Sequence, residues 1–432
     1  MSARAKSRPL VPFERFQLDC GATLLVAPSP GAPVTAIQAH LRGGHSLDPV
    51  GREGTAWMTG RLVDQGTEAK SESEIASALE PIGGSLNGGS SGLSGTVASA
   101  QWKQLFTLFT ESLTRPTFPK ARVDRQRERL LDRLAVERKD PRVQAEQSFR
   151  ALVYGKHWLG RSEVGTIEST AVMKRADLAR FHRQNWVASR AVIAVAGDVQ
   201  PDEVARFLDR RLADWPAGKE LGPPDRSFPK PGVRSKVFAA KRQQVHVYLG
   251  HLGIERSDPD YAKLVVMDHI LGTGPGFTAR ITKRLRDELG LAYTVHAAIY
   301  SSAGVLPGMF TAYIGTSPEH FATALEGFLV EMRRIRETPV SPEELQLAKD
   351  YLTGSFALGF ERASRRAGHL IALERHGFPE NHVEQLLDAF RSATADEIQA
   401  AAARHLHPAR TALSVGGPIA ARDVAQLHAS LS

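Results

Sequence analysis

The chain repeats the stretch Arg190-Ala191-Val192-Ile193-Ala194-Val195-Ala196-Gly197 in a related form, Arg410-Thr411-Ala412-Leu413-Ser414-Val415-Gly416-Gly417. In both copies an arginine precedes an apolar run that ends in glycine, and a segment of helical character leads into the arginine. Recurrence of the same elements in the same order indicates a duplicated structural unit. The sequence therefore predicts two homologous halves.

A segment rich in proline, glycine and charge separates the halves and reads as a semi-rigid linker. We predict an N-terminal domain over 1–215, the linker over 216–234 and a C-terminal domain over 235–432. Each half contains an alternating segment typical of a strand, at 34–41 and 245–251.

Long amphipathic segments, such as 105–113 and 321–335, predict helices packed on the sheets. The expected fold class is α+β, with two homologous domains that each contain a mainly antiparallel sheet packed with helices.

Composition limits the class of protein. Hydrophobic residues make up 42% and charged residues 24%, which is typical of a soluble protein. The basic N-terminus lacks a following apolar region, so we predict a cytoplasmic location, or a periplasmic one if a leader was removed. The single cysteine, Cys20, excludes an internal disulfide and a thiolate metal site. The net charge of +8 comes from basic residues interleaved with acids, so we expect neither nucleic acid nor membrane as a partner.

Residues 54–67 read GTAWMTGRLVDQGT and predict a helix that ends at Gly66. Their frame matches the inverted zinc motif H-x-x-E-H, which places two histidines on one helix face with a glutamate as general base. The three key positions hold Trp57, Gly60 and Arg61 instead. Trp57 and Arg61, four residues apart, are placed to stack as a cation–π pair. No two histidines elsewhere have the spacing of a known zinc pattern.

With this frame, the chain resembles the pitrilysin/insulinase family of inverted-motif zinc peptidases over essentially its whole length. In that family a third zinc ligand, a glutamate, lies several residues before an acidic turn that ends in proline. Counting back from Asp140-Pro141 places that position near Arg133. Arg61 and Arg133 would put two positive charges where a dication should bind. We therefore expect no metal and no cofactor in this chain.

The resemblance also implies a divided active site, in which one subunit carries zinc and the other supplies an arginine and a tyrosine. The segment LRDELGLAY, residues 285–293, matches the family pattern and identifies Arg286 and Tyr293 as this pair. The local pattern predicts a helix with Ile281, Leu285 and Leu289 on its buried side, and then a strand over 291–300. Gly290 is suited to end the helix, so that both side chains can reach one carbonyl oxygen.

Two further segments match the family. Gly272, Gly274 and Gly276 lie in a glycine-rich segment without the lysine of a phosphate loop, so we predict a flexible loop that lines a peptide channel. Asn87 matches an asparagine of the family's substrate-side edge strand. The four residues are predicted to bind substrate.

The leading hypothesis is a non-catalytic subunit of a heterodimeric zinc peptidase, forming half of a clamshell with a homologous H-x-x-E-H subunit that holds the zinc. On this view the chain is no enzyme alone but part of one that acts on peptides or unfolded polypeptides. The alternative is a non-enzymatic scaffold or peptide-binding core subunit of the same fold. A stand-alone metalloprotease conflicts with Trp57, Gly60 and Arg61.

Overall fold

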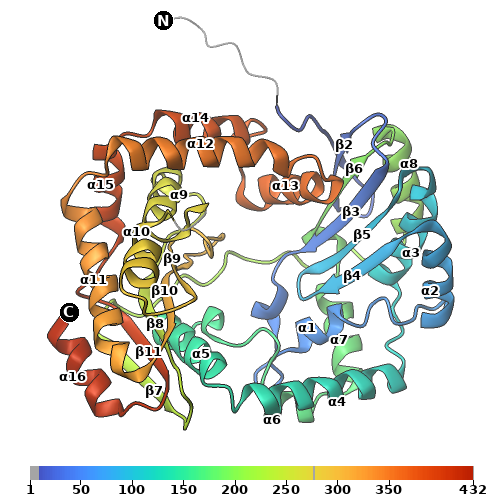
Figure 1. Ribbon diagram of the computed structural model, residues 1–432. Coiled ribbons are helices and arrows are strands. Elements are labelled where there is room, and N and C mark those ends of the chain that lie inside the picture. Colours follow the sequence, from blue (N-terminus) through green and yellow to red (C-terminus); the bar gives the residue numbers. More distant parts are fainter. Residues whose placement is uncertain (1–8, 276–277, 432) are drawn as a thin grey trace, which may run out of the picture. The chain divides into compact units, whose positions relative to one another are not determined.

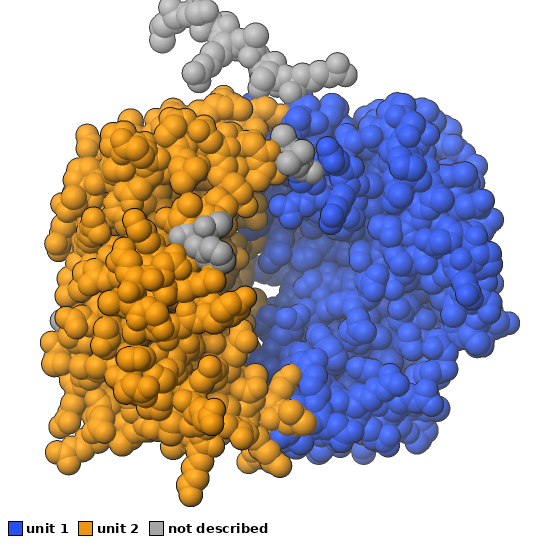
Figure 2. All heavy atoms as spheres, viewed as in Figure 1, with its two compact units in different colours: residues 1–135, 162–223, 357–383 blue, residues 136–161, 224–356, 384–432 orange. Residues whose placement is uncertain are grey.

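The computed structural model describes residues 9–275 and 278–431 (Figure 1). The chain forms two compact units, each assembled from three segments (Figure 2). The first unit comprises 1–135, 162–223 and 357–383, and the second comprises 136–161, 224–356 and 384–432. Among the described residues, no helix combines the length and the apolar character needed to span a lipid bilayer.

The first unit contains a six-stranded sheet. The β2 and β6 strands are parallel, and every other neighbouring pair is antiparallel. In spatial order the strands are β1 (Glu14–Gln17), β2 (Thr23–Pro28), β6 (Ala191–Gly197), β3 (Val34–Leu41), β5 (Gly92–Ala98) and β4 (Ser85–Gly89).

The second unit contains a five-stranded sheet with the same plan. Its strands are, in spatial order, β7 (Arg234–Ala239), β11 (Ala412–Gly417), β8 (Val245–Leu252), β10 (Met309–Thr316) and β9 (Val295–Ala298). The β7 and β11 strands are parallel and the others antiparallel. Apart from β1, each strand of the first sheet has a counterpart in the second with the same place and direction. The predicted α+β class with two homologous, mainly antiparallel sheets is confirmed.

The repeated strand that begins at Ala191 is buried along its whole length, because both faces of the first sheet are covered. Successive side chains of a strand point to opposite faces. Ile193 and Val195 therefore join the core beneath α3 (Trp102–Thr114), while Ala194 packs with Leu370 of α13 (Ala363–His376). A strand buried on both faces reads as a continuous apolar run, as this one does.

The second sheet is covered on its corresponding face by α5 (Pro141–Tyr154), whose Phe149 packs with Tyr248 and Tyr313. Each covering helix thus comes from the opposite half of the sequence, so the two helices are exchanged. The α13 helix lies in the C-terminal half but belongs to the first unit, and α5 lies in the N-terminal half but belongs to the second unit. Each compact unit contains segments from both sides of the 216–234 linker. The division into linear domains at 216–234 stays a prediction.

The predicted amphipathic helices at 105–113 and 321–335 are confirmed as α3 and α11. The helices not yet given bounds are α1 (Thr55–Gly60), α2 (Glu72–Leu79), α4 (Lys120–Glu137), α6 (Ile167–Ala171), α7 (Arg175–Asn185), α8 (Pro201–Leu212), α9 (Tyr261–Asp268), α10 (Arg280–Thr282), α11 (Phe321–Glu337), α12 (Pro342–Gly359), α14 (His382–Ser392), α15 (Ala395–His405) and α16 (Ala421–Leu431). Two π-helical segments, His269–Thr273 and Lys283–Glu288, follow α9 and α10 directly.

Candidate functional site

The α1 helix begins at a loop held by one carboxylate. Asp48 Oδ2 accepts a hydrogen bond from the Gly54 amide at 2.7 Å, and its Oδ1 accepts one from the Ala56 amide at 2.7 Å. Burial raises the pKa of Asp48 to about 6, against the opposing effect of these two hydrogen bonds. Backbone amides at a helix start lack partners within the helix, so Asp48 fixes the entry to α1.

Trp57 and Arg133, two of the residues predicted to stand at degenerate metal positions, lie side by side. The Arg133 guanidinium carbon is 5.7 Å from the centroid of the Trp57 ring, which is within the range of a cation–π contact. Trp57 was predicted to stack with Arg61, but among the described residues the cation over its ring is Arg133. Arg61 is exposed. Arg133 therefore lies beside α1, and its assignment to the position of a third ligand stays a prediction.

Gly60, at the position of the general base, is packed against a backbone. A Cβ added to Gly60 would lie 1.9 Å from the carbonyl oxygen of Gly89, and one added to Gly88 would lie 1.9 Å from the carbonyl oxygen of Gly60. The α1 helix and the β4 strand therefore touch main chain to main chain. No side chain fits at Gly60 unless one of the two elements moves.

These positions do not fit a zinc ion. Zinc in proteins is held by imidazole, thiolate or carboxylate groups, whereas this site offers an indole, a glycine and two guanidinium groups. The carboxylate of Asp48, in the loop before α1, already accepts hydrogen bonds from the amides of Gly54 and Ala56.

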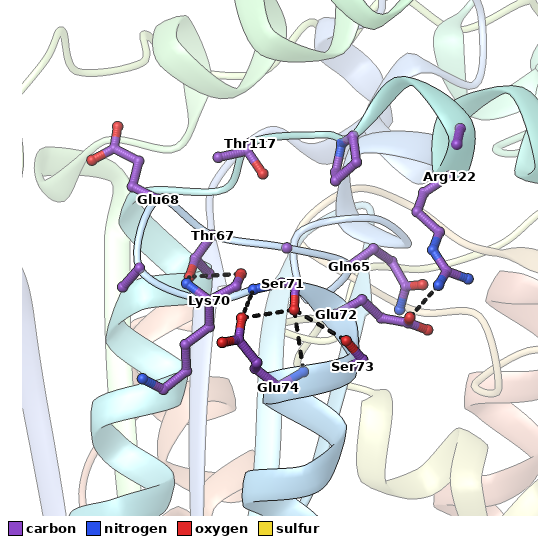
Figure 3. A pocket seen from close by; sticks show the side chains of 14 residues that line it. Gln65, Thr67, Glu68, Lys70, Ser71, Glu72, Ser73, Glu74, Thr117 and Arg122 are labelled. Carbon is purple, nitrogen blue, oxygen red and sulfur yellow. Dashed lines mark hydrogen bonds and ion pairs between the residues drawn. The ribbon is translucent and has the colours of Figure 1, made fainter.

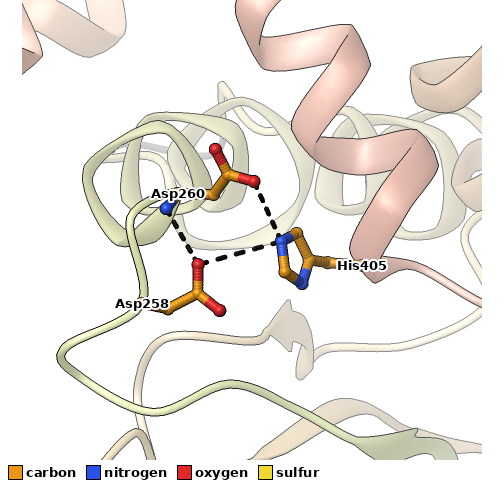
Figure 4. A group of neighbouring side chains, drawn as sticks. All are labelled: Asp258, Asp260 and His405. Carbon is orange, nitrogen blue, oxygen red and sulfur yellow. Dashed lines mark hydrogen bonds and ion pairs between the residues drawn. The ribbon is translucent and has the colours of Figure 1, made fainter.

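Another group of potential ligands, missed by sequence reasoning, lies in the second unit (Figure 4). The ligand atoms of Asp258, Asp260 and His405 lie within 4.8 Å of one another. Two cations already occupy Asp260: Arg404 binds Oδ2 at 2.7 Å and Lys263 binds Oδ1 at 3.2 Å. A divalent ion would have to displace them, so the group is an ion-pair network that ties α15 to the start of α9.

The structure brings Arg286 and Tyr293 together. The Arg286 guanidinium carbon lies 5.1 Å from the centroid of the Tyr293 ring. Gly290 reverses the chain between them with a left-handed φ of 62°. Tyr293 is 86% exposed, and Arg286 is half-buried. A guanidinium and a phenol at this surface can donate hydrogen bonds to one acceptor.

The segment that carries Arg286 differs from the predicted helix in one respect. Ile281 and Leu285 are fully buried as expected, but Leu289 is 46% exposed. Residues 283–288 form a π-helix, whose wider turn moves Leu289 off the stripe that an α-helix would give. The strand predicted over 291–300 is also shorter, because β9 covers only Val295–Ala298. Tyr293 therefore lies in the turn before β9.

The glycine-rich segment is not an open loop at its start. Gly272 is buried inside the first π-helical segment, and a Cβ there would lie 2.3 Å from the carbonyl oxygen of Ala297 in β9. At Gly274 a Cβ would lie 2.5 Å from the carbonyl oxygen of His269. Both glycines allow backbone packing, which corrects the expectation of a flexible loop at these two positions. Gly276 lies outside the described residues, and substrate binding by this segment stays a prediction.

Asn87 is exposed on β4, which forms the edge of the first sheet. Its carbonyl oxygen accepts a hydrogen bond from Ser94 Oγ at 3.2 Å, and its side chain faces solvent. An exposed edge strand presents main-chain groups to a further strand. A role for Asn87 in substrate binding remains a prediction.

Sequence reasoning also missed Asp268, a carboxylate that is fully buried at the end of α9. Its Oδ2 accepts hydrogen bonds from the amides of Ile299 at 2.6 Å and Tyr300 at 3.0 Å. Burial raises the pKa of Asp268 to about 8. The residue fixes the far end of β9 against the helix that leads into the glycine-rich segment. No local pattern marks it, because its partners lie about thirty residues away.

A pocket of about 550 Å³ lies on the first unit, between the loop that precedes α2 and the start of α4 (Figure 3). Its wall contains the ion pair between Glu72 and Arg122 and the capping box of Ser71 and Glu74. None of the predicted site residues lines this pocket.

Comparisons with known proteins show which family the chain resembles. A family model described as insulinase, peptidase family M16, matches residues 24–166, and one described as the peptidase M16 inactive domain matches residues 173–352. A Streptomyces coelicolor protein named as an uncharacterized zinc protease is 26% identical over 93% of this chain and 88% of its own. A Helicobacter pylori protein named non-peptidase homolog YmxG is 26% identical over 85% of both chains.

A solved structure has the same fold. The crystal structure of a peptidase M16 inactive domain from Pseudomonas fluorescens superimposes with a TM-score of 0.89 at 24% identity, covering 95% of this chain and 99% of that one. Together the two family models span both halves of the chain. The chain therefore belongs to the insulinase family of peptidases, family M16.

Proposed function

We propose that this protein is the non-catalytic subunit of a heterodimeric zinc metallopeptidase that acts on peptides or unfolded polypeptides. The observation that carries the proposal is the contact between Arg286 and Tyr293, whose guanidinium carbon and ring centroid are 5.1 Å apart. A scaffold has no use for two hydrogen-bond donors held together at an exposed turn. A cytoplasmic location belongs to the same proposal, with a periplasmic location as the alternative.

The proposed partner is a homologous subunit with an intact H-x-x-E-H motif. Its zinc would supply an activated water and polarise the scissile carbonyl. Arg286 and Tyr293 would donate hydrogen bonds to the same carbonyl oxygen, which gains negative charge as the water adds. Donors aimed at a developing oxyanion contribute about 2.7–4 kcal/mol each to lowering the barrier.

The test is reconstitution with such a partner, followed by digestion of an unfolded protein such as casein. We expect activity only from the mixture. Arg286→Ala or Tyr293→Phe should then lower kcat by roughly 100-fold, as the loss of one oxyanion donor does in other hydrolases. Zinc bound by the mixture should remain unchanged, because neither residue is proposed to bind metal.

A matched control exists in the same unit. The Arg256 guanidinium carbon lies 5.7 Å from the Tyr261 ring centroid, so this pair has the same chemistry without the proposed role. Arg256→Ala should leave kcat within about twofold. Unchanged turnover in both Arg286→Ala and Tyr293→Phe would contradict the proposal and favour the scaffold or peptide-binding alternative.

A further inference from the structure

The segment that carries Arg286 holds two other arginines, and both are anchored by acids. Arg280 forms a bidentate pair with Glu344 of α12, with Nε to Oε1 and Nη2 to Oε2 both at 2.7 Å. Arg284 Nη1 lies 3.0 Å from Oε1 of Glu331 in α11. The guanidinium of Arg286 lies over Tyr293, and its Nε is 3.9 Å from Oδ1 of Asp287.

Glu331 is unusual because its side chain is only 1% exposed. A buried carboxylate is costly unless cations and donors surround it. Its Oε1 faces Arg284 at 3.0 Å and Arg334 at 3.8 Å, while its Oε2 has no hydrogen-bond partner among the described residues. The energy of this buried charge therefore depends on where Arg284 lies.

Arg284 lies inside the π-helical stretch Lys283–Glu288, two residues before Arg286. A π-helical turn holds one more residue than an α-helical turn, so relaxation to an α-helix would rotate every residue that follows. Leu285 blocks this rotation, because its side chain is buried and packs directly on Gly327 of α11. The packing is so close that a Cβ added to Gly327 would lie 2.4 Å from Cδ2 of Leu285. The buried carboxylate of Glu331 resists the same rotation by holding Arg284.

We propose that Glu331, acting through Arg284, is a positioning residue that keeps Arg286 against Tyr293, with Glu344 and Arg280 anchoring the start of the same segment. The inference rests on the proposed function for its catalytic consequence, while its geometric part concerns this chain alone. The substitution Glu331→Gln removes the charge and keeps the shape. Arg284→Met combined with Glu331→Gln removes the pair without leaving a buried charge, which protects the fold if the single variant is unstable.

The first measurement uses the full isolated chain. Hydrogen exchange of residues 283–294 should be at least tenfold faster in Glu331→Gln and in the double variant. The control is Glu111→Gln, which breaks the ion pair of a mostly buried glutamate with Arg211 at 2.8 Å in the other unit. It should leave exchange in 283–294 unchanged. Equal exchange in the wild type and both Glu331 variants would overturn the inference, whatever the partner does.

The second measurement is a double-mutant cycle on kcat in the reconstituted peptidase. Glu331→Gln should lower kcat about tenfold or more with KM unchanged, because small misplacements of a catalytic group are costly. In the Arg286→Ala background the same substitution should change kcat less than twofold. Equal losses in both backgrounds would indicate general destabilisation and overturn the inference. If Arg286→Ala itself has no effect, the proposed function fails, and the exchange result alone decides the geometric part.

Discussion

Gly60 and Gly89 touch through their backbones, so that a Cβ on Gly60 would stand 1.9 Å from the carbonyl oxygen of Gly89. The packing of α1 on β4 therefore leaves no room for a side chain at Gly60, the position at which the inverted motif would have its glutamate. A restored motif would have to separate the helix from the strand.

We expect that restoring the motif does not restore zinc. A variant with Trp57→His, Gly60→Glu, Arg61→His and Arg133→Glu should bind less than stoichiometric zinc by elemental analysis and unfold at lower temperature than the wild type. Gly60→Ala alone should cost about 2 kcal/mol or more, as overpacked positions do. Gly354→Ala is the control, since a Cβ there meets no atom within 4 Å. Stoichiometric zinc in the restored variant would contradict the packing argument.

Asp268 should make the fold less stable as pH rises. Its pKa is about 8 in the folded chain, against an ordinary value of 3.8. Between these values the unfolded chain has released the proton that the folded chain still holds. The contribution of this group to the free energy of unfolding is therefore greatest below about pH 4. It falls by at most about 1.4 kcal/mol per pH unit as the pH rises, and stops falling above about pH 8.

The measurement is the unfolding free energy of Asp268→Asn and of the wild type at several pH values. The advantage of the variant should grow from pH 4 to pH 8. Asp48→Asn is the comparison: the pKa of Asp48 is about 6, so the pH-dependent part of its difference should stop growing near pH 6. A difference for Asp268→Asn that is constant with pH would show that this carboxyl titrates normally.

The group of Asp258, Asp260 and His405 should bind no divalent cation in the wild type, because Arg404 and Lys263 occupy Asp260. Adding Mn²⁺ or Zn²⁺ to the untagged protein should not shift its unfolding temperature. Replacing Arg404 and Lys263 by methionine frees the Asp260 carboxylate, and Mn²⁺ or Zn²⁺ should then stabilise the protein by mass action. A metal-dependent shift in the wild type would refute this interpretation of the ion-pair network.

Neither linear half of the chain should fold alone. Residues 1–215 lack α13 and would expose Leu25 and Ala194, while residues 235–432 lack α5 and would expose Tyr248. Both fragments should aggregate when expressed separately. A chain nicked inside the 216–234 linker keeps every element, so its two pieces should elute together by gel filtration until denaturant is added. Two soluble, cooperatively folding fragments would contradict the exchange of α5 and α13.

The sequence predicted those parts of the fold that have a local signal. The repeated run at Ala191 and Ala412 predicted two related sheets because a strand buried on both faces is continuously apolar. Arg286 and Tyr293 were paired by the resemblance of residues 285–293 to the family's segment, and Gly290 marks the turn between them. The exchange of α5 and α13 has no such signal, because an amphipathic helix does not indicate which of two apolar sheets it will cover.

The site residues that escaped prediction depend on contacts distant in sequence. Asp268 is defined by amides about thirty residues away, and His405 meets Asp260 across 145 residues. The π-helical turn at Lys283–Glu288 also has no local pattern, so Leu289 was placed on the wrong side. The contact of Gly60 with Gly89 requires knowledge of which strand lies beside α1.

The exchange of α5 and α13 also has a consequence for synthesis on the ribosome. The sheet of the first unit is formed from residues that emerge early, but the helix that covers its second face ends at His376. Until then the apolar side chains of β2 and β6 on that face have no cover, and exposed sheets of this kind are prone to aggregate. The nascent chain must therefore carry an unfinished N-terminal unit while most of the second unit is translated.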